Sequence, residues 1–275
     1  MKDKYSAGVK IIAHRGARSI APENTLSAAG KAFEAGSDLW ETDVSVTRDG
    51  HLVLFHDQTL ERTTDAKTVF PESPTYRLAD FTLARLSELN TGLPFIKADP
   101  FGTIRKGLIT RADIESYADE KIPTLEQALL FTKKWGRGVN LEIKETIYTE
   151  PAFPITEKVL AAIRKTGISP KLVTISSFCH EWLEEIQHSA PEIRVQALIA
   201  PGMLDKAFHP YTPFDTFNID KALINKKVMT RLARLNKRVN VYTVNNPKQA
   251  GRFMELGVNG IFTDYPQVLG PAPGR

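Results

Sequence analysis

The sequence predicts a closed (β/α)8 barrel, also called a TIM barrel, from two observations. First, short apolar runs alternate with amphipathic stretches along the chain, which implies βαβ units and a parallel sheet. Second, eight such units can be counted if one hairpin takes a single position in the sheet, and eight units suggest a closed barrel with its active site at the carboxyl ends of the strands. The chain has 275 residues, 42% of them hydrophobic, which is enough for one large core.

The first predicted strand ends at a polar motif. Residues 9–13 form a short apolar run that stops at His14-Arg15-Gly16. After a loop, Asn24 is the expected N-cap of a helix that runs to residue 35 and is closed by Gly36. We expect Glu23 and Asn24 to organise the loop above the site and not to act in catalysis.

A β-hairpin is predicted next, because Arg48-Asp49-Gly50 separates strand-like runs at residues 39–46 and 52–55. Glu41 and Asp43 lie two residues apart in the first of these strands, so their side chains share one face. The returning strand brings both carboxylates near His56. Asp49 and Asp57 are most simply explained as turn residues.

Residues 58–121 show no sustained periodicity, because proline and glycine interrupt them repeatedly. One short helix is expected over residues 78–89. A stretch of this length inside a compact domain is usually a functional lid or a small inserted subdomain.

The rest of the chain alternates between strand and helix. Thr124 is expected to cap a helix over 124–135, with Glu126-Gln127 close to a capping-box position. Strands are predicted at 139–143, 172–176, 195–199, 214–219, 239–243 and 260–263, helices at 155–166, 181–188, 226–236 and from Asn246-Pro247 onward, and irregular structure at 201–213.

Three carboxylates, Glu41, Asp43 and Glu142, fall at or near the ends of neighbouring predicted strands. They offer only hard oxygen ligands, which suit one divalent cation, Mg²⁺ or Ca²⁺, and argue against a thiolate zinc site. Two purely structural roles stay open at this point. Arg15 could serve only to neutralise Glu41 or Asp43, and Glu142 could form a salt bridge with Lys144.

Four motifs in this order and spacing resemble the glycerophosphodiester phosphodiesterase family. They are His14-Arg15-Gly16, Ala21-Pro22-Glu23-Asn24-Thr25, Glu41-x-Asp43-Val44 and His56-Asp57. The resemblance extends through 140–144, 175–178, 242–245 and 260–264, and is weakest between about 66 and 122. It covers most of the chain and implies one phospholipase C-like phosphodiesterase barrel over residues 1–275, with an insertion at about 58–123 after the second strand and its hairpin.

The resemblance also implies an activity. Members of this family hydrolyse glycerophosphodiesters such as glycerophosphocholine or glycerophosphoethanolamine to sn-glycerol 3-phosphate and an alcohol, with a metal and two catalytic histidines. The resemblance implies that these histidines are His14 and His56. Imidazole titrates close to neutral pH and suits either proton step. Which of the two is the acid stays open, as does the choice between a cyclic phosphate intermediate and direct attack by water.

Four further residues are candidates for binding the substrate. Arg15 can hold the non-bridging phosphate oxygens through its planar fork, and Lys144 can add a positive charge. Phe178 and Tyr242 follow later strands and could wall the glycerol pocket, although packing of the barrel rim explains them equally well. Many family members have Trp where this chain has Tyr242, which leaves the fit of the substrate open.

Two other functions remain possible. One is a lysophospholipase D on the same barrel, which a more open, apolar mouth would favour. The other is a catalytically silent barrel that binds phosphodiesters. Serine-nucleophile elbows and glycine-rich phosphate loops are absent from the sequence.

Net charge and composition limit the expected partners and cellular compartment. The formal charge is +4 with basic and acidic residues intermixed, so we expect a small-molecule substrate and no nucleic-acid partner. Cys179 is the only cysteine and excludes an intrachain disulfide. Because the sequence shows neither a signal peptide nor a membrane span, we expect a cytoplasmic protein. The sequence does not indicate an oligomeric state.

Overall fold

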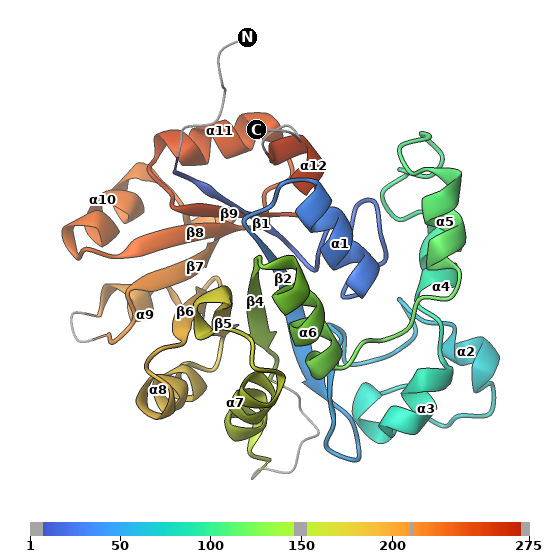
Figure 1. The fold of residues 1–275 in the computed structure, drawn as a ribbon. Coiled ribbons are helices and arrows are strands. Elements are labelled where there is room, and N and C mark those ends of the chain that lie inside the picture. Colours follow the sequence, from blue (N-terminus) through green and yellow to red (C-terminus); the bar gives the residue numbers. More distant parts are fainter. Residues whose placement is uncertain (1–7, 146–152, 210–211, 271–275) are drawn as a thin grey trace.

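The barrel predicted from the sequence is confirmed. The structure is a computed structural model that describes residues 8–145, 153–209 and 212–270. Eight parallel strands follow one another around the barrel in chain order (Figure 1). It closes because β1 (Lys10–Ala13) pairs with both β2 (Leu39–Val46) and β9 (Gly260–Thr263).

The remaining strands lie within three residues of their predicted bounds. They are β4 (Gly138–Ile143), β5 (Val173–Ser177), β6 (Arg194–Ile199), β7 (Thr216–Asp220) and β8 (Arg238–Tyr242). The predicted hairpin is also present, since β3 (Leu52–Leu54) runs antiparallel to β2 and Gly50 takes a positive φ of 76° in the turn. Its returning arm brings the backbone of Phe55 to within 3.0 Å of the carbonyl oxygen of Asp43.

Helices cover the outside of the barrel (Figure 1). They are α1 (Leu26–Glu34), α6 (Leu125–Trp135), α7 (Ile155–Thr166), α8 (His180–Ser189), α9 (Leu204–Phe208), α10 (Lys226–Arg234), α11 (Pro247–Glu255) and α12 (Pro266–Leu269). Thr124 and Gln127 form the predicted capping box of α6. The prediction of irregular structure at 201–213 was wrong at α9, which has five residues and is too short to show a helical period.

The main hydrophobic core lies between the strands and these helices. Val139, Leu141 and Ile143 of β4 point outward and are buried there. The alternate residues of each strand point into the barrel, so the polar groups of the sequence motifs lie inside it. Within the described ranges, no helix combines the length and apolar character needed to cross a membrane.

The segment between β3 and α6 has more helix than the sequence predicted. It contains α2 (Ala66–Val69), α3 (Leu83–Glu88), α4 (Gly92–Ala98), α5 (Arg111–Tyr117) and a 3₁₀ turn at Leu78–Asp80. The prediction of a single helix over 78–89 was wrong. Each helix of this segment has at most seven residues and is too short to show a helical period in the sequence.

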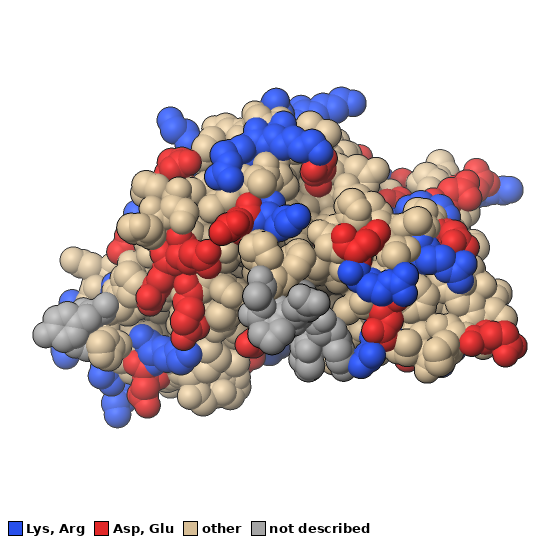
Figure 2. Space-filling model, turned by 90° about the horizontal axis from the view of Figure 1, so that it is seen from below, with Lys and Arg blue, Asp and Glu red and all other residues tan. Residues whose placement is uncertain are grey.

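This segment extends to one side of the barrel (Figure 1) and has hydrophobic clusters separate from the main core. Phe70 and Phe81 stack in one of them with ring centroids 5.4 Å apart. We propose that residues 58–123 are an insertion within a single domain. On the face shown in Figure 2, Lys and Arg side chains are interspersed with Asp and Glu.

Replacing Gly16 by Ala should destabilise the fold by about 2–4 kcal/mol. Gly16 has φ of 78°, and an added Cβ would lie 2.6 Å from atoms of Ala28 in α1. Gly107→Ala is a matched control, because Gly107 has φ of 66° but an added Cβ would meet nothing within 4 Å. The control should therefore lose only the conformational part, about 1 kcal/mol. Urea unfolding measures both, and equal losses would contradict the proposed steric contact.

Candidate active site

A cavity of about 340 Å³ opens at the carboxyl ends of the strands. Eight of the nine residues predicted for the site line it: His14, Arg15, Glu41, His56, Glu142, Lys144, Phe178 and Tyr242. The ninth, Asp43, is 1% exposed and lies against Glu41 and Glu142. Residues from six separate segments of the sequence therefore meet in one place. The sequence did not predict that Leu198, Asp220, Lys221 and Phe262 also line this cavity.

The three carboxylates form one cluster. Each of Glu41, Asp43 and Glu142 offers an oxygen, and these oxygens lie within 4.8 Å of one another. Burial, and then the charges of Asp43 and Glu142, raise the pKa of Glu41 well above its usual range. Its Oε1 is buried and makes no hydrogen bond with any described residue. An unpaired buried oxygen beside two other carboxylates is suited to a divalent cation.

Two cations flank the cluster. Lys144 Nζ lies 2.8 Å from Glu142 Oε1 and 3.6 Å from Asp43 Oδ1, while Arg15 Nε lies 3.4 Å from Asp43 Oδ2. Burial would raise the pKa of Asp43, but the charges of Arg15 and Lys144 outweigh it and lower that pKa. The ion pairs expected from purely structural roles of Arg15 and Glu142 are thus formed. Among the described residues, the side chain of Glu41 then has one hydrogen bond, from the backbone N–H of Arg15 at 2.8 Å.

His14 is oriented by a carboxylate from the far end of the chain. Its Nδ1 lies 2.7 Å from Asp264 Oδ1, so Nε2 is the ring nitrogen left for a ligand in the cavity. Burial is the largest cause that lowers the pKa of His14, and Asp264 opposes it. No motif of the sequence indicated that Asp264 contacts His14. Its contact with His14 depends on the pairing of β1 with β9, which no local motif indicates.

His56 is oriented in the same way. Its Nδ1 lies 2.6 Å from Asp57 Oδ1, so the prediction that Asp57 is simply a turn residue was wrong. Arg62 donates to Asp57. It also donates to both carboxylate oxygens of Glu23, at 2.9 and 2.7 Å. Glu23 in turn accepts from Arg15 at 2.9 Å. This network connects the start of the 58–123 segment with both sides of the cavity.

Asn24 holds the strand that carries the buried carboxylates. The N-cap of α1 is Thr25, whose side chain accepts from the N–H of Ala28, so the prediction of Asn24 as the cap was wrong by one residue. Asn24 has φ of 58° and donates from Nδ2 to Asp43 Oδ2 at 2.9 Å. Its Oδ1 accepts from the Thr42 hydroxyl at 2.8 Å and from the Asp43 N–H at 3.1 Å.

Two aromatic side chains form a wall of the cavity. The rings of Phe178 and Tyr242 meet edge to face with centroids 6.4 Å apart. The Tyr242 hydroxyl donates to the carbonyl of Ile199 at 3.0 Å, which ties that ring to the barrel rim. Both rings therefore line the cavity and pack at the rim, so the two roles expected from the sequence coexist.

Replacing Arg62 by Met should lower stability in a pH-dependent way. Burial would raise the pKa of Glu23, but hydrogen bonds from Arg62 and the charges of Arg18 and Arg15 hold it well below its usual range. The pKa of Asp57 is also lowered, since His56 and Arg62 outweigh its burial. A lowered carboxyl pKa stabilises the fold above the unfolded value of about 4 and ceases to do so as pH falls through the folded value.

The Arg62→Met variant should therefore lose about 1 kcal/mol at pH 6–7, with the loss shrinking below about pH 4. Arg111→Met is a matched control, because Arg111 pairs with Glu115 at 2.8 Å but is 92% exposed. Urea unfolding at several pH values checks this expectation. A loss that does not change between about pH 2 and 7 would contradict it.

Comparison with known proteins agrees with this geometry. The model of the glycerophosphoryl diester phosphodiesterase family matches residues 14–268. The chain belongs to this family. Glycerophosphodiester phosphodiesterases of Caldanaerobacter subterraneus subsp. tengcongensis and Bacillus altitudinis are 31% identical over 263 residues and 32% identical over 268 residues. Each comparison covers 94% of this chain and 95% of the relative.

Solved structures of the glycerophosphodiester phosphodiesterase family share the fold. The Agrobacterium tumefaciens enzyme has a TM-score of 0.70 at 24% identity, over 94% of this chain and 98% of that one. An Oleispira antarctica phosphodiesterase, in complex with the product sn-glycerol-3-phosphate, has a TM-score of 0.72 at 25% identity over 95% of both chains. Membership of the family makes this protein a phosphoric diester hydrolase with an acidic cluster able to bind a metal ion.

Proposed function

We propose that the protein hydrolyses glycerophosphodiesters, such as glycerophosphocholine or glycerophosphoethanolamine, to sn-glycerol 3-phosphate and an alcohol. The observation that carries this proposal is the convergence of three carboxylates, two carboxylate-paired histidines and two cations on one cavity. The product bound to the Oleispira antarctica phosphodiesterase supports the choice of substrate class.

Glu41, Asp43 and Glu142 would hold one divalent cation, Mg²⁺ or Ca²⁺. Both ions prefer hard oxygen ligands, and the unpaired Oε1 of Glu41 is an oxygen that such an ion would satisfy. When bound, the cation supplies positive charge that polarises the phosphoryl group and stabilises the charge that develops on it.

The protein side chains supply the other functions that hydrolysis needs. Arg15 and Lys144 bind the non-bridging phosphate oxygens, for which the Arg15 guanidinium offers a planar fork. His14 and His56 transfer protons through Nε2, because Nδ1 of each ring is paired with a carboxylate. One accepts the proton of the attacking hydroxyl, either of glycerol or of water, and the other protonates the leaving alcohol.

The lining of the cavity favours a deacylated substrate over a lysophospholipid. Phe178 and Tyr242 offer apolar faces for the glycerol carbons. A more open, apolar mouth formed by residues 66–122 would favour a lysophospholipase D, but none of the described residues that line the cavity comes from this segment. A volume of about 340 Å³ is at the small end of the usual range for ligand sites.

Release of sn-glycerol 3-phosphate from glycerophosphocholine and glycerophosphoethanolamine tests this proposal. The protein would be treated with EDTA and assayed with Mg²⁺ or Ca²⁺ added back, with lysophosphatidylcholine as a competing substrate class. Activity that EDTA removes and either ion restores would support the proposal. Faster cleavage of lysophosphatidylcholine would favour a lysophospholipase D, and no release from any substrate by the folded protein would favour a binding role.

A further inference from the structure

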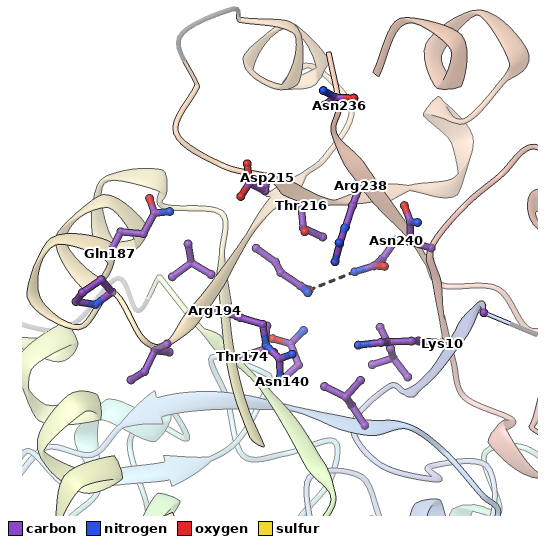
Figure 3. A pocket seen from close by; sticks show the side chains of 18 residues that line it. Lys10, Asn140, Thr174, Gln187, Arg194, Asp215, Thr216, Asn236, Arg238 and Asn240 are labelled. Carbon is purple, nitrogen blue, oxygen red and sulfur yellow. Dashed lines mark hydrogen bonds between the residues drawn. The ribbon is translucent and has the colours of Figure 1, made fainter. Parts of the chain in front are cut away.

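A second cavity lies at the opposite end of the barrel, where the parallel strands begin (Figure 3). Its volume is about 770 Å³, more than twice the 340 Å³ of the cavity at the carboxyl ends. Residues of β1, β2 and β4 to β8, together with residues outside the strands such as Asp215 and Asn236, form its walls. None of the residues assigned to hydrolysis lines it.

The interior of the barrel is polar at this end. Asn140 precedes Glu142 by two residues and Asn240 precedes Tyr242 by two, so these side chains point inward from β4 and β8. Barrel interiors are usually filled by branched apolar side chains. In this barrel, amide side chains occupy these inward-facing positions. Asn240 Nδ2 donates to Asn218 Oδ1 at 2.9 Å and to Gln196 Oε1 at 3.3 Å.

Hydrogen-bonding groups on the cavity side remain unpaired. Asn140 is 1% exposed, yet neither its Nδ2 nor its Oδ1 bonds to any described residue. Asn218 Nδ2 is likewise unpaired among the described residues, but Asn218 is fully buried next to Asn240 and does not line the cavity. Gly260 of β9 keeps room for this layer, because a Cβ at that position would lie 2.5 Å from Asn240 Oδ1. The unpaired amide of Asn140 on the cavity wall indicates that a polar occupant completes this end of the barrel.

Positive charge surrounds the entrance to this cavity. Lys10, Arg194 and Arg238 lie at the first positions of three strands, and Asp215 is the only carboxylate among the described lining residues. Figure 3 shows the three basic side chains together with Asn140 and Asn240. Arg194 donates to the carbonyl of Lys171, whereas the side chains of Lys10 and Arg238 bond to no described residue. Cations without partners favour an anionic occupant.

An apolar layer separates the two cavities. Ile12, Leu39, Phe262 and Tyr242 pack together across the barrel. Ile12 and Leu39 line the cavity at the start of the strands, while Phe262 and Tyr242 line the one at their ends. A ligand in one cavity therefore does not share the polar groups of the other.

We propose that the cavity at the start of the strands binds a small phosphate monoester that also carries hydroxyl groups. Lys10, Arg194 and Arg238 contact the phosphate, for which arginine offers a bidentate fork. Asn140, which lines the cavity, hydrogen-bonds to a hydroxyl group through its unpaired amide atoms. The volume is within the usual range for small-molecule sites. The proposal does not depend on the reaction at the other end of the barrel.

Isothermal titration calorimetry with glucose 6-phosphate tests this site, with inorganic phosphate and glucose as further probes. Three proteins are compared: wild type, the double variant Lys10→Gln/Arg238→Gln, and Lys144→Gln as a variant of the hydrolytic cavity. Glucose 6-phosphate should bind the wild type and Lys144→Gln alike and the double variant at least about tenfold more weakly. Inorganic phosphate should also lose affinity in the double variant, and uncharged glucose should bind none of the proteins measurably.

The double variant should fold normally, because both of its side chains are exposed and bond to no described residue. Arg194→Gln, tested alone, provides a second variant, and urea unfolding checks all of them. The double variant should also hydrolyse glycerophosphocholine at the wild-type rate. A failure of the hydrolysis proposal would therefore be distinguishable from a failure of the binding proposal. Equal binding of glucose 6-phosphate by the wild type and the double variant would overturn the site, as would no binding by the wild type.

Discussion

Replacing Glu41 by Gln should slow the hydrolysis of glycerophosphocholine on the order of 10³-fold. The neutral amide has nearly the same shape but removes one of the three negative charges of the cluster. It also places a donor where a cation would need an oxygen ligand. Since Asp43 and Glu142 repel the buried carboxylate, the metal-free variant should be at least as stable as the wild type.

Measuring both activity and Tm separates the loss of metal binding from the change in stability. Mg²⁺ or Ca²⁺ should raise the Tm of the wild type but leave the Tm of Glu41→Gln unchanged, because binding to the folded state alone stabilises it. Glu185→Gln is the control, since Glu185 is an exposed acid on α8. A variant that keeps wild-type activity and the wild-type response to EDTA would show that Glu41 is not a metal ligand.

Removing either histidine should lower kcat by about 10²–10⁴-fold, the usual contribution of general acid–base catalysis. His14→Ala and His56→Ala each delete one of the proposed proton-transfer groups but leave the acidic cluster intact. KM should change less than kcat, because the phosphate is held by Arg15 and Lys144. The pH profile should lose one limb in each variant, and the limb that disappears identifies the acid and the base.

The control for both histidines is His188→Ala, which alters a residue of α8 outside the cavity. Asp264→Asn tests the orientation of His14 separately from its chemistry. The amide keeps the shape of Asp264 but stabilises the imidazolium less, so kcat should fall less than in His14→Ala and the corresponding limb should shift. If kcat remains within about twofold of wild type in both His→Ala variants, two-histidine catalysis is excluded.

Much of the barrel could be predicted from the sequence, because each strand is an apolar run that ends at a turn signal. The bounds of β2 and β9 agree with the prediction residue for residue. The segment from α2 to α5 could not be predicted, since its helices are too short to repeat an apolar face. Its stability comes from clusters such as that of Phe70 and Phe81, which depend on tertiary packing.

Some residues of the candidate site could likewise be predicted from the sequence, and others could not. Motif residues such as Glu41 and Asp43 could be identified because the alternation of a strand fixes which side chains share a face. The partners of the histidines could not be. Asp57 is adjacent to His56 and resembled a turn residue, because a neighbour in sequence gives no sign of its side-chain direction. The predicted N-cap of α1, Asn24, is one residue before the actual cap, Thr25, since both Asn and Thr are good N-caps.

The pairing of β1 with β9 has a consequence for the order of events during synthesis. His14 and Asp264 are separated by 250 positions in the chain, and their hydrogen bond joins the ends of the first and the last barrel strands. The ribosome therefore delivers the carboxylate that orients His14 only after every other strand has emerged. A partly synthesised chain cannot complete this pair, so formation of the hydrogen bond between His14 and Asp264 would report closure of the whole barrel.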